Sequence, residues 1–303
     1  MRADVLNKNS GAYDGKTRAT TIFKWNYINC GSPIWSHAQS SNSSGPVTAD
    51  GHRVAMLFPG DSGELYHAEM CRIGASTGPV ETPVIEGTVP AIDTGTTAAG
   101  LNMQLDQDVA ADLGWELTPG GAPLGNNSNK YVVGVHSGHI DITVFAAEWT
   151  TYDAISIGFR KAENYNTGHA PIVAAGTGDP LYTDFATFGL QESDKIQIAT
   201  RLNDTGSTGI YTDTVDTPTN SQNQRFRVAM DTDGAVTYKV VQNAVAGAGA
   251  LAAPSATKAY TFDSGDTLVP YVFIHGVDHA DTAMLLKDIE VVRDQEVKGH
   301  SVA

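Results

Sequence analysis

The chain has 303 residues, a length that allows two domains or one large β domain with extensions. Its 34 acidic and 19 basic residues give a formal net charge of −15, which repels the phosphates of nucleic acids. The sequence contains neither an apolar run of ~18 residues that could cross a membrane nor the apolar core of a secretion signal, so we expect a chain that folds in the cytoplasm and binds neither nucleic acid nor membrane.

Residues 1–74 are predicted to form a small β-rich N-terminal region that anchors the protein. The runs ATTIFKWNYINC, HRVAMLF and ELYHAEMCRI are typical of strands, and PGDSG at residues 59–63 predicts a tight turn between the last two. Because so few strands cannot enclose all of their apolar side chains, we expect a partner chain to cover part of this surface. The apolar side chains concerned are Ile22, Phe23, Trp25, Tyr27, Ile28, Val54, Met56, Leu57, Phe58, Leu65 and Tyr66.

Cys30 and Cys71 are the only cysteines of the chain. Two thiols in a chain of this length make no disulfide framework, and neither has a partner at zinc-ligand spacing. We expect two buried free thiols, and the sequence leaves their redox state open.

Residues 75–97 differ in composition from the segments on either side. Pro79, Pro83 and Pro90 would interrupt a hydrogen-bonded ladder, and small or β-branched residues fill the space between them. This composition predicts an extended arm that lies across a neighbouring polypeptide.

From residue 98 to residue 303, short strand candidates recur with turn signals between them, and no amphipathic helix longer than a turn or two stands out. The run LVPYVFIHGV at residues 268–277 is apolar almost throughout, which is typical of a strand buried between two layers. The pattern predicts an all-β fold with two antiparallel sheets packed face to face.

The stretch FRVAMDTDGAVTYKVV at residues 226–241 predicts a β-hairpin, because apolar and polar residues alternate on both sides of the bend. Gly234 supplies the positive φ of a short hairpin loop, and Asp231 and Asp233 are turn-forming residues. Asp-Thr-Asp-Gly also opens many calcium loops, but the twelfth position from Asp231 is Gln242 rather than the bidentate glutamate of an EF-hand. We therefore predict a structural turn.

The segments GFRKAENY (158–165), the hairpin 226–241 and YTFDSGDTLVPYVFIHGVDHADTAMLLKDIEVV (260–292) occur in this order. Together they resemble a domain that is common in virion proteins of marine tailed phages, and that domain is similar to the concanavalin-A-like jelly roll of many lectins and glucanases. The resemblance covers roughly residues 98–295 and departs from the pattern at 243–257, where NAVAGAGALAAPSAT lengthens a loop. It implies a concanavalin-A-like antiparallel β-sandwich at 98–303 and a structural role in a virion.

The jelly roll also carries glycoside hydrolases, whose chemistry needs two carboxylates, ~5–5.5 Å apart in retaining enzymes. Such enzymes usually place them on one strand as E-x-D-x-E, a spacing that we do not find. Asp288 and Glu290 in KDIEVVRDQE are the best carboxylate candidates, but Arg293–Glu296 reads as a solvated tail. We therefore expect a structural role for this stretch.

Histidines and tryptophans supply the remaining candidates. A surface cation site at residues 278–281 competes with the simpler interpretation of an acidic loop with exposed imidazoles. Trp35 lies in a polar loop and is the best exposed aromatic for stacking on a sugar, whereas Trp115 and Trp149 lie in strand patterns. The metal candidates are His136, His139, His275, His279, Asp278 and Asp281. We assign no catalytic, cofactor-binding or metal-binding residue.

The sequence thus predicts a non-enzymatic structural component of a phage virion, a capsid-associated decoration or cement protein that is assembled in the host cytoplasm. We expect other virion proteins as partners, the major capsid protein among them, and a homo-oligomer, with a trimer as the state that the resemblance suggests. A carbohydrate-binding adhesin on the virion or tail is the alternative, and a glycan-cleaving enzyme is the third hypothesis.

Overall fold

The computed structural model describes residues 17–35, 53–73, 85–86, 98–102, 113–125, 129–146, 154–166, 182–190, 195–204, 210–242, 250–276 and 284–296. Every regular element in this part of the chain is a β-strand. No helix long and apolar enough to cross a membrane occurs in it.

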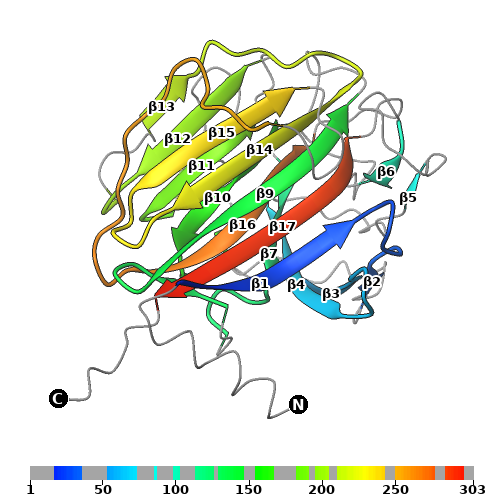
Figure 1. Cartoon of the computed structure of the whole chain (residues 1–303), viewed down its shortest axis with the longest axis horizontal. Coiled ribbons are helices and arrows are strands. Elements are labelled where there is room, and N and C mark those ends of the chain that lie inside the picture. Colours follow the sequence, from blue (N-terminus) through cyan, green and yellow to red (C-terminus); the bar gives the residue numbers. More distant parts are fainter. Residues whose placement is uncertain are drawn as a thin grey trace.

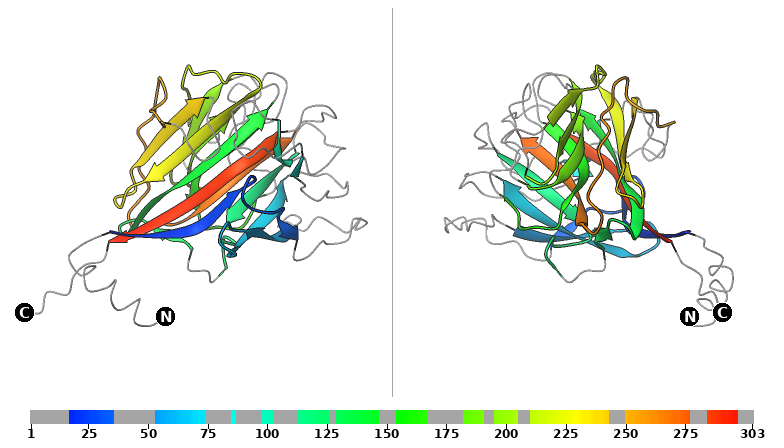
Figure 2. Two further views of the ribbon diagram at one scale, coloured as in Figure 1. Left: turned by 45° about the vertical axis from the view of Figure 1, so that its right-hand side comes forward. Right: turned by 90° about the vertical axis from the view of Figure 1, so that its left-hand side faces the viewer.

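Two antiparallel sheets pack face to face as a β-sandwich, seen from the front in Figure 1 and as two layers in Figure 2. The seven-stranded sheet contains β1 (Thr17–Asn26), β5 (Ile85–Glu86), β6 (Gly100–Asn102), β9 (His136–Ala146), β14 (Gln222–Met230), β15 (Val236–Gln242) and β17 (Leu285–Glu296). The ten-stranded sheet contains β2 (Ile34–Trp35), β3 (Arg53–Pro59), β4 (Leu65–Ile73), β7 (Leu113–Pro119), β8 (Tyr131–Val132), β10 (Ala154–Lys161), β11 (Phe185–Leu190), β12 (Ile196–Arg201), β13 (Ile210–Asp213) and β16 (Thr267–Gly276). The predicted all-β antiparallel sandwich is confirmed.

The core lies between the two sheets and follows from the period-two alternation of the strands. In β14, Phe226, Val228 and Met230 belong to one continuous hydrophobic cluster that also takes side chains from the facing sheet. Phe188 of β11 packs edge-on against Phe226, with ring centroids 5.5 Å apart. The predicted buried strand at 268–277 is confirmed as β16, which lies between β10 and β7 in the ten-stranded sheet.

The N-terminal strands belong to both sheets of the sandwich. β1 pairs with β17 from Thr17 opposite Glu296 to Asn26 opposite Asp288, and β4 pairs with β7. Phe23 of β1 contacts Phe58 of β3 across the two layers, with ring centroids 4.9 Å apart. These strands therefore help to close the core.

The expectation that a partner covers the N-terminal apolar surface is wrong for most of its residues. Ile22, Phe23, Trp25, Tyr27, Met56 and Phe58 are buried within the chain itself. Leu65 is 59% exposed, and the side chain of Val54 lies outside the description. The sandwich encloses the six buried side chains because β1 and β3 lie on opposite sides of one shared core. This burial no longer argues for an oligomer.

Of the predicted arm at 75–97, the structure describes only Ile85–Glu86, which pairs with Gly100 and Leu101 of the same chain. The rest of the arm lies outside the described residues. The division into 1–74, 75–97 and 98–303 stays a prediction, although the described strands of the first segment are hydrogen-bonded to strands of the last.

The last strand, β17, lies inside the seven-stranded sheet. It pairs with β9 along one edge and with β1 and β6 along the other, and the pairing with β1 extends to Glu296. The solvated tail predicted at Arg293–Glu296 is therefore wrong. A strand with one face towards the solvent tolerates charges on that face, so the charged residues did not mark the end of regular structure.

A substitution at Gly158 tests how closely β10 and β11 approach. A Cβ added at Gly158 would overlap the backbone carbonyl oxygen of Ala186, which a side-chain rotation cannot relieve. We expect Gly158→Ala to lower the free energy of unfolding by roughly 1–3 kcal/mol in denaturant titrations, as other overpacking substitutions do. Gly31→Ala is the control, because the nearest atom to its added Cβ is Pro59 Cγ at 3.7 Å. Equal stability of the two variants would contradict the backbone contact.

Candidate functional site

Five polar side chains gather on the face of the ten-stranded sheet that points away from the other sheet. They are Glu116 and Thr118 of β7, Arg160 of β10, Thr187 of β11 and Tyr271 of β16, and each is at most 1% exposed. The residues between them along the strands belong to the core, so alternation places these five on the opposite side. We call this surface the polar face.

The centre of the polar face is a buried ion pair that a tyrosine completes. Arg160 Nε donates a hydrogen bond to Glu116 Oε1 at 2.7 Å, and the Tyr182 hydroxyl donates to Glu116 Oε2 at 2.5 Å. The Arg160 guanidinium carbon also lies 4.1 Å from the centroid of the Tyr182 ring, a cation–π distance. Both carboxylate oxygens of Glu116 are therefore engaged by neighbouring side chains.

The environment keeps this cluster in one protonation state. Burial by itself would lower the pKa of Arg160, but the adjacent Glu116 carboxylate more than reverses this, so the pKa is raised and the guanidinium stays charged. Burial, together with the negative charge of Glu116, raises the pKa of Tyr182 well above its usual value, so the phenol remains a donor. Arg160 Nη1 donates to the backbone carbonyls of Lys161 and Glu163 at 2.9 and 3.1 Å.

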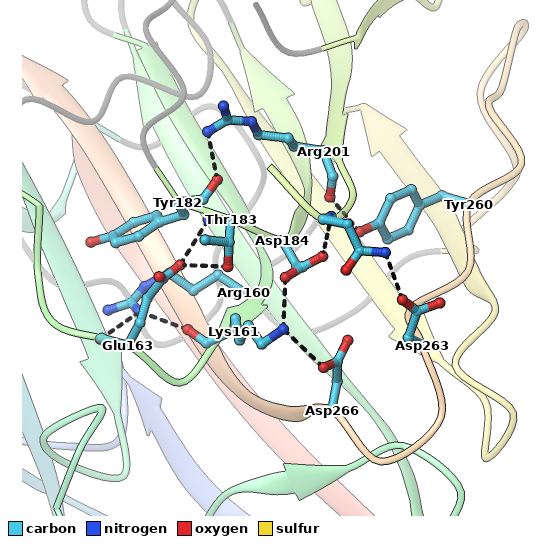
Figure 3. A network of polar contacts seen from close by, with 11 residues as sticks. Arg160, Lys161, Glu163, Tyr182, Thr183, Asp184, Arg201, Tyr260, Asp263 and Asp266 are labelled. Carbon is cyan, nitrogen blue, oxygen red and sulfur yellow. Dashed lines mark hydrogen bonds and ion pairs between the residues drawn. The ribbon is translucent and has the colours of Figure 1, made fainter. Parts of the chain in front are cut away.

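A second polar network continues from this ion pair (Figure 3). Lys161 Nζ lies 3.0 Å from a carboxylate oxygen of Asp184 and 3.0 Å from one of Asp266. Hydrogen bonding to Asp184 raises the pKa of Lys161, so the lysine stays charged between the two carboxylates. Asp184 Oδ1 also accepts a hydrogen bond from the Asn203 backbone N–H at 2.6 Å, and Asn203 Nδ2 donates to Asp263 at 2.7 Å. One cation thus joins the end of β10 to two loops.

The hairpin between β14 and β15 attaches to the same loop. Phe262 N–H donates to the Gly234 carbonyl at 3.0 Å, and Ala235 and Thr261 form an isolated β-bridge. Because Lys161 contacts Asp266 a few residues further on, all three segments that carry the virion-protein resemblance meet here, although they are far apart in the sequence. Their side chains hold loops together.

The predicted turn at 231–234 is present. Gly234 has a φ of 90°, and Asp231 Oδ1 accepts a hydrogen bond from the Ala235 N–H at 2.8 Å. Gln242, the residue at the twelfth position, uses its side chain to contact Thr217 and Thr219. Nowhere in the described part of the chain do three or more histidine, cysteine or acidic side chains form a group that could hold a metal ion.

The outer face of the seven-stranded sheet brings together the carboxylates that the sequence considered for catalysis. Asp288 and Glu290 lie on the same face of β17, and Asp141 of β9 lies directly opposite Glu290. Arg225 donates to both oxygens of Asp141 at 2.8 Å. His139 Nε2 is 3.8 Å from Glu290 Oε2.

A surface depression beside this cluster does not include the carboxylate pair. Its walls are formed by the start of β9, the end of β14, the turn and start of β15, and Asp294, and His139 is the residue that it shares with the carboxylate cluster. Neither Asp288 nor Glu290 lines the depression. The structure therefore brings the two carboxylates onto one face but not to the wall of a described cleft.

The other residues singled out by the sequence lie in separate places. His136 Nδ1 accepts a hydrogen bond from the Val132 N–H at 3.0 Å, and Trp115 is buried in the core. Cys30 and Cys71 are buried free thiols, as predicted. Asp278, His279, Asp281 and Trp149 lie outside the described residues, as do the side chains of Trp35 and His275.

Sequence reasoning missed Glu116, Arg160 and Tyr182. The available signal was a charged residue inside an otherwise apolar strand, as in LGWELTP and AISIGFRK. Charged side chains in such positions are rarely buried unless they are paired, so each one predicts an oppositely charged or hydrogen-bonding partner on another strand. The pattern cannot say which strand supplies it.

Comparisons with known proteins show loose similarities only. No protein-family model matches the chain, and no curated protein matches it in sequence. The CBM2 module of the evolved Dit of Lactobacillus casei BL23 phage J-1 shares 8% identity at a TM-score of 0.39, over 93% of this chain and 98% of that one. A carbohydrate esterase from Shiga toxin-encoding bacteriophage phi24B shares 11% identity at a TM-score of 0.37, over 92% of this chain and all of that one.

A legume lectin-like domain from Entamoeba histolytica is similar at 7% identity and a TM-score of 0.38, over 75% of this chain and 90% of that one. All three TM-scores are below 0.5. No ligand or activity of this chain follows from them, and the sandwich is established by the two sheets themselves.

The buried ion pair makes a strong prediction for stability. Arg160→Met should lower the free energy of unfolding by roughly 3–5 kcal/mol, because it leaves the Glu116 carboxylate buried without its cation. Lys195→Met is the matched control, since it breaks an ion pair with Asp213 whose side chains are 48% and 38% exposed. That change should cost ~1 kcal/mol or less. Chemical denaturation of both variants provides the measurement, and a small effect at Arg160 would contradict the central role of the pair.

The turn at 231–234 gives a further prediction for stability. Asp231→Ala should lower the free energy of unfolding by about 1 kcal/mol, because it removes the hydrogen bond to Ala235. Asp233→Ala should change it by ~0.5 kcal/mol or less, as exposed substitutions usually do. Thermal melts with and without calcium complete the test. A calcium-dependent rise in melting temperature that Asp233→Ala abolishes would show a metal site instead.

Proposed function

We propose that the chain is a structural component of a phage virion, a capsid-associated decoration or cement protein. The observation that carries this proposal is that the three segments that resemble a virion-protein domain, 158–165, 226–241 and 260–292, meet in the fold and have structural contacts there. Arg160, Lys161 and Asp266 lie in these segments, and their side chains close the polar face and tie loops together. Residues used in this way support a stable exterior scaffold and do no chemistry on a substrate.

The state of Glu116 supports a non-enzymatic role. A general acid, base or nucleophile needs a carboxylate oxygen that can face the reacting atoms. Both oxygens of Glu116 accept hydrogen bonds from Arg160 and Tyr182, and the side chain has no exposed surface. We therefore propose that the chain is not an enzyme, with glycan cleavage as the hypothesis that this arrangement favours least.

The proposed partners are other virion proteins, foremost the major capsid protein, and further copies of this chain in a homo-oligomer, with a trimer as the first state to test. The proposed location is the assembled particle. The exposed side chains Ile34, at 55%, and Leu65, at 59%, lie near one edge of the ten-stranded sheet and are available for such contacts.

Carbohydrate binding is the second candidate function. Tyr165, Tyr182 and Tyr271 surround Arg160 on or beside the polar face, and tyrosine rings are surfaces on which sugars stack. Among the described residues, Arg160 Nη2 has no hydrogen-bond partner and is a free donor within this aromatic group. All three rings are at most 3% exposed, which favours the structural proposal.

A binding experiment distinguishes the two functions. The purified chain is mixed with capsids that lack it and, separately, applied to a glycan array. We expect the chain to sediment with the capsids and to show no selective binding on the array. Selective glycan binding without capsid binding would replace the virion proposal with the adhesin. Mass spectrometry of purified particles should find the chain in the capsid fraction.

A further inference from the structure

Asp288 is a buried carboxylate at the contact between the N-terminal strand β1 and the last strand β17. Its side chain has a single hydrogen bond among the described residues, which Asn26 Nδ2 donates to Oδ2 at 2.9 Å. Asn26 is the last residue of β1 and lies directly opposite Asp288 in the strand pairing. The residue is only 9% exposed, so water solvates an ionised carboxylate poorly at this position.

The charged groups around Asp288 do not compensate for its charge. From β9, Asp141 lies opposite Glu290 and diagonally from Asp288 as a second carboxylate, and Arg225 and Arg227 of β14 both direct their guanidinium groups to Asp141. Glu290, two residues along β17, lies on the same face and adds another negative charge. Arg225 favours ionisation of Asp288, but its Nε and one of its terminal nitrogens donate to Asp141.

The remaining charges of these strands face other groups. Lys24 of β1 is exposed and lies opposite Glu290 in the pairing, and the imidazole Nε2 of His139 of β9 lies 3.8 Å from the Glu290 carboxylate. Lys287, the residue before Asp288, lies 5.2 Å from the ring centroids of Tyr27 and Phe145. Asp288 thus lies beside two other carboxylates, with a neutral amide as its hydrogen-bond donor.

The pKa of Asp288 is raised to about 7, first by burial and then by the charges of Asp141 and Glu290, which together outweigh the opposing effects of Asn26 and Arg225. The neighbouring His139, 3.8 Å away, instead lowers the pKa of Glu290. Asp288 and Glu290, which lie on one face of β17, therefore differ in protonation near neutral pH. In the unfolded chain Asp288 returns to its ordinary pKa, so the folded state binds its proton more tightly.

The position of Asp288 gives this proton a structural consequence. In the described part of the chain, β1 pairs with no strand except β17. The pair also holds both ends of the described fold, because Thr17 lies opposite Glu296. An ionised Asp288 would repel Asp141 and Glu290 and would gain solvation if the β1 end of this pair opened.

We propose that the buried carboxyl of Asp288 is a proton-operated latch: β1 stays on β17 when Asp288 is protonated, and the contact loosens when Asp288 ionises beside Asp141 and Glu290. The stability that the latch contributes is fully present below the unfolded pKa of Asp288. It is lost as the pH rises through the folded pKa. The latch does not depend on the proposed virion function.

Hydrogen exchange of the full chain tests the latch. Protection factors of the amides in residues 17–26 are measured at pH 6 and at pH 8.5. A protection factor is a ratio to the intrinsic exchange rate at the same pH, so it corrects for the pH dependence of exchange itself. We expect wild-type protection to fall about tenfold or more relative to Asp288→Asn at pH 8.5, and the two proteins to agree more closely at pH 6. The asparagine keeps the shape and the acceptor for Asn26 but cannot ionise.

Glu290→Gln is the matched control. It removes a negative charge that faces Asp288 without touching the Asn26 contact, so the pH at which β1 loses protection should move downward. Carboxyl NMR of the wild-type chain supplies a readout that needs no variant, with a titration of Asp288 that the β1 amide shifts follow. Equal protection of wild type and Asp288→Asn at both pH values would overturn the latch, as would an Asp288 titration near its ordinary pKa.

Discussion

The burial of Arg160 is the constraint on which the polar face depends. A guanidinium with no exposed surface must be compensated by a carboxylate and by hydrogen bonds, or the charge would strongly destabilise the fold. Glu116, Tyr182 and two backbone carbonyls provide this compensation from β7, from residues before β11 and from the loop after β10. The strands and loops around the ten-stranded sheet are therefore held in one arrangement.

The same logic operates on the other sheet with a different result. Asp141 is as deeply buried as Glu116 but has two arginines, so its charge is well compensated. Asp288, close by, has only the amide of Asn26 as its hydrogen-bond donor. One sandwich thus carries a locked polar cluster on one face and a titratable one on the other, and the difference arises from the number of cations within reach.

Much of the fold could be predicted from the sequence, because alternation of residues such as Phe226, Val228 and Met230 reports directly which face of a strand is buried. The turn at Gly234 follows from local chemistry in the same way. Alternation gives the face but not the neighbour across the sheet, so the contact between Glu116 and Arg160 could not be found. For the same reason the sequence predicts an anchoring region at β1 and a solvated tail at Arg293–Glu296, although nine of the ten residues of β1 pair with β17, up to Glu296.

The account rests on the claim that Glu116, Arg160 and Tyr182 compensate one another's buried polar groups and contact no ligand. The most direct test replaces all three with apolar residues of similar size, as Glu116→Met, Arg160→Met and Tyr182→Phe in one chain, and compares stability and capsid binding with the wild type. Replacing a whole buried ion pair with apolar groups is often neutral, so we predict a free energy of unfolding within ~1 kcal/mol of the wild-type value and unchanged capsid binding. A stably folded triple variant that no longer binds its partner would contradict the claim.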